Sequence, residues 1–120
     1  MAMYGTIARI KVKRDKLREL YALGQEWDDF HRKDVPGFIG TEILWEEKEP
    51  GRACMIVRFT NRELYFQNAN SPQQHEFYLR LRACLEAEPD WIDGYYDKWD
   101  SLYHRPPAFL TEPPREKVGS

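Results

Sequence analysis

The sequence lacks the short motifs that mark most nucleotide-dependent and metal-dependent enzymes. It contains neither a Gly-rich phosphate loop nor a Gly-x-Ser-x-Gly elbow, which respectively place a phosphate group and a nucleophilic serine. Its three histidines and two cysteines form no HxxxH, HxxE or CxxC spacing, so a metal site is not expected. We therefore predict no metal and no other cofactor.

Long apolar runs and an excess of one charge are also absent. No stretch approaches the roughly 18 apolar residues of a membrane span, so we expect no membrane partner. The 18 basic and 20 acidic residues leave a net charge of −2, whereas nucleic-acid-binding domains are usually basic. Nucleic acid is therefore not an expected partner. Two cysteines, Cys54 and Cys84, without an apolar leader at the N-terminus predict reduced thiols in a cytoplasmic protein.

Aromatic residues, by contrast, are abundant. The 120 residues include four Trp, seven Tyr and six Phe. A chain of this length forms one domain with one modest core. Burying so many rings requires an additional apolar surface, which an oligomer interface or a ligand cavity would supply.

Apolar periodicity and turn signals divide the chain into alternating strands and helices. Asp15, Thr60 and Ser71 are the expected helix N-caps, and Val35-Pro36-Gly37 and Glu49-Pro50-Gly51 are the expected breaks. The predicted elements are a strand over 3–12, a helix from Asp15 to about His31, strands over 38–48 and 52–60, a short helix from Thr60 to about Asn68, a helix from Ser71 to about Glu88 and a strand over 91–99.

This order of elements predicts an α+β fold of the ferredoxin-like β-α-β-β-α-β type. The product is a four-stranded antiparallel sheet with both long helices on one face, and the domain spans residues 1–99. Residues 100–120 hold half of the eight prolines and are expected to form an extended Pro-rich tail, since proline interrupts helices and sheet interiors.

The second face of the predicted sheet is too apolar to remain in water. An apolar patch of several hundred Å2 is rarely exposed on a soluble monomer, so we expect a homodimer that pairs through this face. The large residues assigned to it are Val12, Leu44, Trp45, Val57, Phe59 and Tyr95.

The motif Val35-Pro36-Gly37-Phe38 between the first helix and the second strand resembles the dimeric α+β-barrel superfamily, in particular the antibiotic biosynthesis monooxygenase-like (ABM) proteins. The runs Asn70-Ser71-Pro72-Gln73-Gln74-His75 and Glu88-Pro89-Asp90-Trp91, with Gly94 after them, resemble small bacterial members with no assigned function. The likeness spans roughly residues 3–97. It implies a dimeric barrel and a cofactor-independent monooxygenase that acts on a small aromatic or quinol-like molecule.

The candidate site combines a base with a set of aromatic rings. His75 falls in the first turn of the second long helix, where the positive helix end favours a neutral, proton-accepting imidazole. The alternative is a surface histidine that packs on Tyr78 or Leu79. The predicted catalytic residues are His75 and Tyr78, and the predicted substrate-binding residues are Arg9, Trp27, Trp45 and Trp91.

Each of these assignments has an alternative from the sequence alone. Aromatic residues at helix or strand spacing are more often core residues than a binding site, and Arg9 either points to solvent or pairs with an acid of a neighbouring strand. At the level of function, the alternative is a non-catalytic dimer that binds a small apolar ligand or a protein. A third interpretation is haem binding through His75, although the resembling haem-degrading branch uses an Asn in the first strand that this chain lacks.

Overall fold

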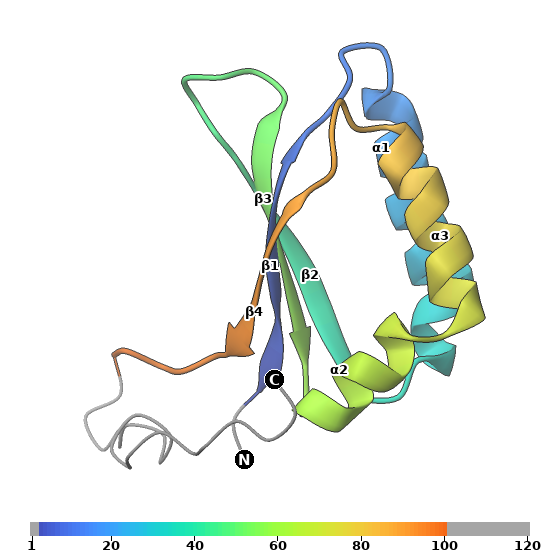
Figure 1. Cartoon of the computed structure of the whole chain (residues 1–120), viewed down its shortest axis with the longest axis vertical. Coiled ribbons are helices and arrows are strands. Elements are labelled where there is room, and N and C mark those ends of the chain that lie inside the picture. Colours follow the sequence, from blue (N-terminus) through green and yellow to red (C-terminus); the bar gives the residue numbers. More distant parts are fainter. Residues whose placement is uncertain (1–2, 101–120) are drawn as a thin grey trace, which may run out of the picture.

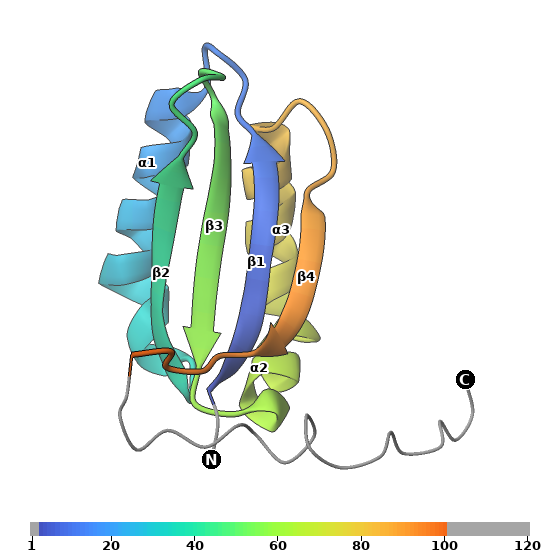
Figure 2. The same ribbon diagram turned by 90° about the vertical axis from the view of Figure 1, so that its left-hand side faces the viewer.

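The structure is a computed structural model that describes residues 3–100. The strands are antiparallel to each neighbour and follow the order β2-β3-β1-β4. Both long helices cover one face of the sheet, and the other face is open (Figures 1 and 2). The predicted ferredoxin-like α+β fold is therefore confirmed. Its elements are β1 (Tyr4–Lys11), α1 (Leu17–Glu26), β2 (Phe38–Trp45), β3 (Arg52–Phe59), α2 (Arg62–Ala69), α3 (Pro72–Ala83) and β4 (Asp90–Tyr95).

The core lies between the sheet and the pair α1 and α3. Alternate residues of β1 and the chain after it, Ala8, Ile10 and Val12, are buried together with Leu20 of α1 and Leu85. This alternation is what the two-residue repeat of a strand produces when one face is covered. None of the helices in residues 3–100 is long and apolar enough to cross a membrane. The Pro-rich tail predicted at residues 100–120 lies outside the described residues except for its first residue.

Of the three predicted helix caps, one is confirmed and two are wrong. The Ser71 hydroxyl accepts a hydrogen bond from the backbone N–H three residues later at 3.1 Å. Asp15 does not cap α1, because that helix begins after Lys16 and its N-cap makes no side-chain bond. The N-cap of α2 is Asn61 rather than Thr60. The Asn61 backbone is extended, and its side-chain oxygen accepts a hydrogen bond from the Leu64 N–H at 2.9 Å.

The ends of α3 and β4 also differ from the prediction, and tertiary contacts are made at both. After α3 the chain pairs with the segment that leaves β1: Glu86 N–H donates to Lys11 at 2.9 Å and Lys13 N–H donates to Cys84 at 2.8 Å. The helix therefore stops before its predicted end. Strand β4 ends at Tyr95 rather than continuing to 99. The hydroxyl of the next residue, Tyr96, lies within hydrogen-bond distance of the Val57 carbonyl oxygen at 2.8 Å and of the Thr6 carbonyl oxygen at 3.0 Å.

The apolar residues assigned to the open face of the sheet are mostly on its other side. Of the six, only Leu44 lies on the open face. Side chains alternate between the two faces along each strand, and the register of the sheet puts the other five on the face that the helices cover. An error of one residue in the phase of a strand moves all its side chains to the opposite face. The five residues that face the helices instead are Val12, Trp45, Val57, Phe59 and Tyr95.

The open face is instead a mixture of isoleucines and ion pairs. Ile56, Ile7 and Ile92 form one continuous row across β3, β1 and β4, and Ile92 is 68% exposed. Leu44 lies in the next row, beside Cys54. Two ion pairs, Arg9–Glu46 and Arg58–Glu42, flank these apolar side chains.

Candidate functional site

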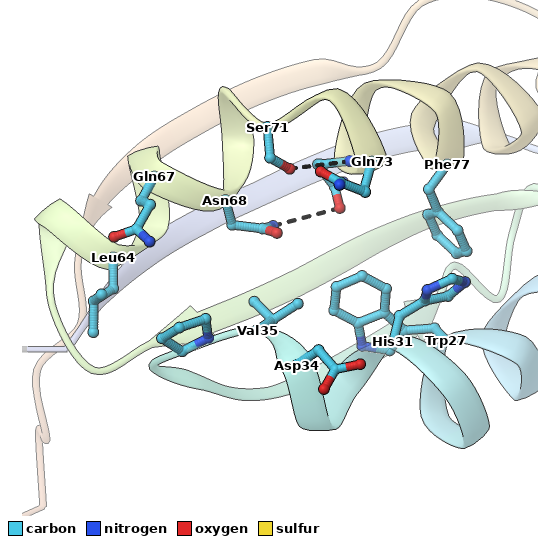
Figure 3. A pocket seen from close by; sticks show the side chains of 12 residues that line it. Trp27, His31, Asp34, Val35, Leu64, Gln67, Asn68, Ser71, Gln73 and Phe77 are labelled. Atoms are coloured by element: carbon cyan, nitrogen blue, oxygen red, sulfur yellow. Dashed lines mark hydrogen bonds between the residues drawn. The ribbon is translucent and has the colours of Figure 1, made fainter.

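A cavity of about 400 Å3 lies at one end of the helical layer, where the end of α1, the turn before β2, α2 and α3 meet. This volume falls within the usual range for small-molecule sites. Figure 3 shows rings at one end of the cavity, amide side chains along α2 and the start of α3, and apolar residues of the turn on the opposite side. The arrangement offers an occupant both apolar and hydrogen-bonding surfaces.

A π-helical turn shapes this cavity. α1 does not continue as a regular helix but widens over Trp27–His31 and tightens again over Arg32–Asp34. Widened turns of this kind occur often at functional sites. Both terminal residues of the turn, Trp27 and His31, line the cavity. Gly37 then reverses the chain with φ of 80°, and a Cβ there would lie only 2.6 Å from Leu64 of α2.

Trp27 is held between two phenylalanine rings. Its ring centroid lies 5.2 Å from that of Phe38 and 5.4 Å from that of Phe77. Its indole nitrogen Nε1 is buried and has no hydrogen-bond partner, the one such side-chain atom among residues 3–100. A buried donor without a partner is uncommon in native proteins. Nε1 itself is closed off from water-sized molecules, so a ligand in the cavity reaches it only if the Trp27 ring turns.

His31 is held in place by a carboxylate that also binds α3. Its Nε2 lies 3.0 Å from Glu26 Oε2, and Arg80 of α3 donates two hydrogen bonds to the same carboxylate at 2.6 and 2.8 Å. The hydrogen bonds from Arg80, and then that from His31, lower the pKa of Glu26 to about 2. The Glu26 side chain is therefore an ionised acceptor at neutral pH.

Amide side chains form the polar wall of the cavity. Asn68 Nδ2 donates to Gln74 Oε1 at 3.4 Å, and Gln67 and Gln73 line the same wall. Amides both donate and accept hydrogen bonds without carrying charge. No group of three or more His, Cys, Asp or Glu side chains in residues 3–100 is arranged to hold a metal ion.

The structure brings together one predicted catalytic residue, Tyr78, and one predicted substrate-binding residue, Trp91. Tyr78 and Trp91 are neighbours, with ring centroids 5.9 Å apart. The Tyr78 hydroxyl donates to Glu88 at 2.5 Å, and burial, then Glu88, raises the pKa of Tyr78 to about 12. His75 is exposed on α3 and does not line the cavity.

The other predicted residues lie apart from one another. Arg9 is on the open face of the sheet, where it donates two hydrogen bonds to Glu46 at 3.1 and 3.2 Å. Trp45 faces the helices and packs on Tyr21 of α1, with centroids 6.5 Å apart. Of the six predicted site residues, Trp27 alone lines the cavity.

Two residues of the cavity wall, His31 and Phe77, were not predicted from the sequence. His31 was expected only as the end of the first helix. A usable signal was present, because Trp27 and His31 are four residues apart and such residues share one face of a helix. Phe77 carries no local signal, since its role depends on how α3 packs against the end of α1.

Solved structures with this fold include a cofactor-independent oxygenase and several proposed monooxygenases. A solved structure of a conserved protein from Methanosarcina mazei is 20% identical with a TM-score of 0.67, covering 78% of this chain and 92% of that one. A proposed antibiotic biosynthesis monooxygenase from Nitrosomonas europaea is 17% identical with a TM-score of 0.64, covering 85% and 92%. SnoaB, a cofactor-independent oxygenase from Streptomyces nogalater, is 16% identical with a TM-score of 0.63, covering 87% and 100%.

At these identities the structural likeness shows a shared fold alone. No curated protein matches the chain by sequence. The family model for antibiotic biosynthesis monooxygenases (ABM) matches residues 3–80, which is more than half of the chain. The resemblance noted from the Val-Pro-Gly-Phe motif is thereby confirmed, and the chain belongs to the antibiotic biosynthesis monooxygenase family.

Proposed function

We propose that this protein is a cofactor-independent monooxygenase that binds a small aromatic or quinol-like molecule in the cavity beside Trp27. The observation that carries the proposal is a cavity of about 400 Å3 whose wall includes Trp27, a residue with a buried, unpartnered indole N–H. A turn of the Trp27 ring would bring this N–H to an oxygen atom of an occupant. Family membership and the fold shared with SnoaB support oxygenase chemistry.

The cavity wall suits a flat, oxygenated molecule. The rings of Trp27 and Phe77 offer aromatic surface, and the amides of α2 and α3 offer neutral hydrogen-bonding groups. An electron-rich phenol can react with dioxygen without an external reductant: one oxygen atom enters the ring to give a quinone, and the other leaves as water with the two hydrogens that the phenol loses. In this scheme the protein binds, orients and partly desolvates the phenol.

The proposal is tested by oxygen uptake with 1-naphthol in a buffer that contains a metal chelator, with 1-methoxynaphthalene as the control that lacks the hydroxyl. We expect one dioxygen consumed per naphthoquinone formed, and one oxygen-18 atom in the quinone when oxygen-18 gas is used. Binding of 1-naphthol and of further phenols and quinols without oxygen uptake would refute the oxygenase and favour the non-catalytic binding dimer.

The placement of the site is tested with a pair of matched variants. Trp27→Phe removes the indole N–H and keeps a ring, so we expect 1-naphthol to bind about tenfold more weakly, the effect of losing one net hydrogen bond. Trp91→Phe makes the same change beside Tyr78, outside the cavity. The placement is wrong if Trp91→Phe weakens binding and Trp27→Phe does not.

We further propose that two copies pair through their open sheet faces into a dimeric α+β barrel. The row of isoleucines and Leu44, which is 62% exposed, supplies the apolar surface that the pairing would cover. Leu44→Asp should convert a dimer to a monomer in a native mass measurement. Leu79→Asp, on the exposed side of α3, should leave the dimer intact. A wild-type monomer at micromolar concentration would contradict the pairing.

The two cysteines fit the expected cytoplasmic location. Cys54 and Cys84 are both free thiols in the structure. Persistent free thiols are typical of proteins in a reducing compartment. Cys84 is buried at the end of α3, and this burial raises the pKa of its thiol, which makes it a structural rather than a reactive cysteine.

A further inference from the structure

The hydrogen bond between Glu26 and His31 determines which imidazole nitrogen carries the proton. Glu26 is ionised, so its oxygens can only accept hydrogen bonds. The His31 Nε2 that lies 3.0 Å from Glu26 Oε2 therefore carries a hydrogen and donates it. In the neutral tautomer that has this hydrogen, Nδ1 carries the lone pair and is able to accept a proton. This is how a carboxylate fixes the tautomer of a histidine in many functional sites.

The position of the His31 ring is fixed from two sides. Glu26 is clamped to α3 by both terminal nitrogens of Arg80, a residue 54 positions away in sequence. The imidazole also packs edge-on against Phe77 of α3, with ring centroids 5.8 Å apart and an angle of 68°. The imidazole is therefore tied to α3 directly through Phe77 and indirectly through Glu26 and Arg80, and these contacts define its orientation.

His31 and Trp27 are neighbours in the cavity wall. Both residues line it, and their ring centroids are 6.1 Å apart. With the indole N–H turned toward the cavity, one substrate oxygen can give its hydrogen to the imidazole and accept a hydrogen bond from the indole. Asp34 also lines the wall.

We propose that His31 accepts the proton of a phenolic hydroxyl bound in the cavity, with Glu26 and Arg80 as positioning residues. This inference rests on the proposed function and narrows its substrate class to aromatic molecules with an ionisable hydroxyl group. In the step, the phenolic O–H bond breaks, the proton forms a bond with Nδ1, and the electron pair stays on oxygen. The Trp27 N–H then donates to the phenolate, and Glu26 faces the resulting imidazolium.

The phenolate is the form that the reaction needs. Removing the proton leaves an extra electron pair to delocalise into the ring, which makes the ring a better electron donor toward dioxygen. A phenol ether has no proton to give, so it binds the same rings without entering this step. Binding of the aromatic ring and ionisation of its hydroxyl group can therefore be measured separately, the first with a phenol ether and the second with a phenol.

The probe for ionisation is 4-nitrophenol, whose phenolate absorbs visible light and whose phenol form does not. At a pH where the free probe is mainly protonated, we expect wild-type protein to raise the phenolate band as the probe binds. His31→Gln should lower the bound phenolate fraction at least tenfold. Binding of 4-nitroanisole, followed by tryptophan fluorescence, should stay within twofold in the same variant. His75→Gln is the matched control and should leave both signals unchanged.

The positioning role of Glu26 is tested by nitrogen-15 NMR of the imidazole rings. The chain has three histidines, so the signals can be assigned with one His→Gln variant each. We expect the Nε2–H tautomer for His31 in the wild type and a mixture of tautomers in Glu26→Ala. A wild-type ring protonated mainly on Nδ1 would overturn the inference, because its lone pair would then point at the carboxylate.

The outcomes separate this inference from the proposed function. A phenolate band that depends on His31, without oxygen uptake from 1-naphthol, supports the proton acceptor and refutes the oxygenase. Oxygen uptake that is unchanged in His31→Gln keeps the oxygenase and overturns the proton acceptor. Failure of 4-nitrophenol to bind, or binding without a phenolate band, also overturns the role given to His31.

Discussion

A methyl group added at Gly5 should destabilise the fold strongly, because strand β3 leaves no room for it. Gly5 lies in the middle of the sheet, opposite Arg58 of β3 and Gly94 of β4. A Cβ at this position would be 1.9 Å from the Val57 carbonyl oxygen and 3.0 Å from the Tyr96 ring. The Val57 backbone and the hydrogen-bonded Tyr96 ring therefore leave no space for a side chain at Gly5.

The size of the effect follows from the shift needed to relieve this contact. To reach an ordinary separation of 3.4 Å from the present 1.9 Å, β3 must move by about 1.5 Å, which stretches neighbouring ladder bonds beyond hydrogen-bond length. Two or three lost bonds at about 1 kcal/mol each lower the free energy of unfolding by about 3 kcal/mol. A typical domain has only about 5–15 kcal/mol in total.

The assay is urea unfolding followed by circular dichroism, with Gly94→Ala as the control. A Cβ at Gly94 meets no atom of residues 3–100 within 4 Å, and alanine restricts the unfolded chain more than glycine does. Gly94→Ala should therefore be neutral or stabilising by about 0.5–1 kcal/mol. If Gly5→Ala unfolds at the wild-type urea concentration, the close approach of β1, β3 and Tyr96 is wrong.

Two further substitutions test the core and the charge cluster. Leu85 is fully buried, so Leu85→Ala should cost about 2–5 kcal/mol by leaving a cavity, while Leu79→Ala, at a position 52% exposed, should stay within about 0.5 kcal/mol. Equal effects in urea unfolding would contradict the assigned core. Because Arg80 and His31 lower the pKa of Glu26 from 4.5 to about 2, the ionised carboxylate stabilises the fold above pH 4.5 and this contribution disappears as the pH falls toward 2. Unfolding curves of wild type and Glu26→Gln should converge over that range, and a constant difference would contradict the clamp.

The fold could be predicted because its signals are local. Alternating apolar residues, the Ser71 cap and the Gly37 and Gly51 turns each act within a few residues, and their order determines the topology. The face of each strand was not predictable in the same way. Leu44 and Trp45 are adjacent, so strand alternation puts them on opposite faces and the assignment of both to one face could hold for one of them at most. Which of the two faces the core depends on the phase of the strand, and an error of one residue in phase exchanges the core and the open face.

The candidate site was predictable only at Trp27, for a physical reason. The cavity is assembled from four segments, and a widened helical turn that depends on packing against α3 and β2 gives it its shape. Sequence spacing places His75 near the start of α3, and its exposed side chain corresponds to the alternative of a surface histidine. Arg9 was expected near substrate or paired with an acid, and the Glu46 pair across the open face corresponds to the second expectation.

The most direct test of the account is the set of indole N–H signals in a proton–nitrogen-15 spectrum, recorded as 1-naphthol is added without oxygen. The chain has four tryptophans, and Trp27→Phe identifies the signal of interest. The account predicts a downfield shift of the Trp27 signal, because its unpartnered N–H gains an acceptor, with the other three signals nearly unmoved. An unmoved Trp27 signal with a shift at Trp91 would contradict it and place the ligand beside Tyr78 instead.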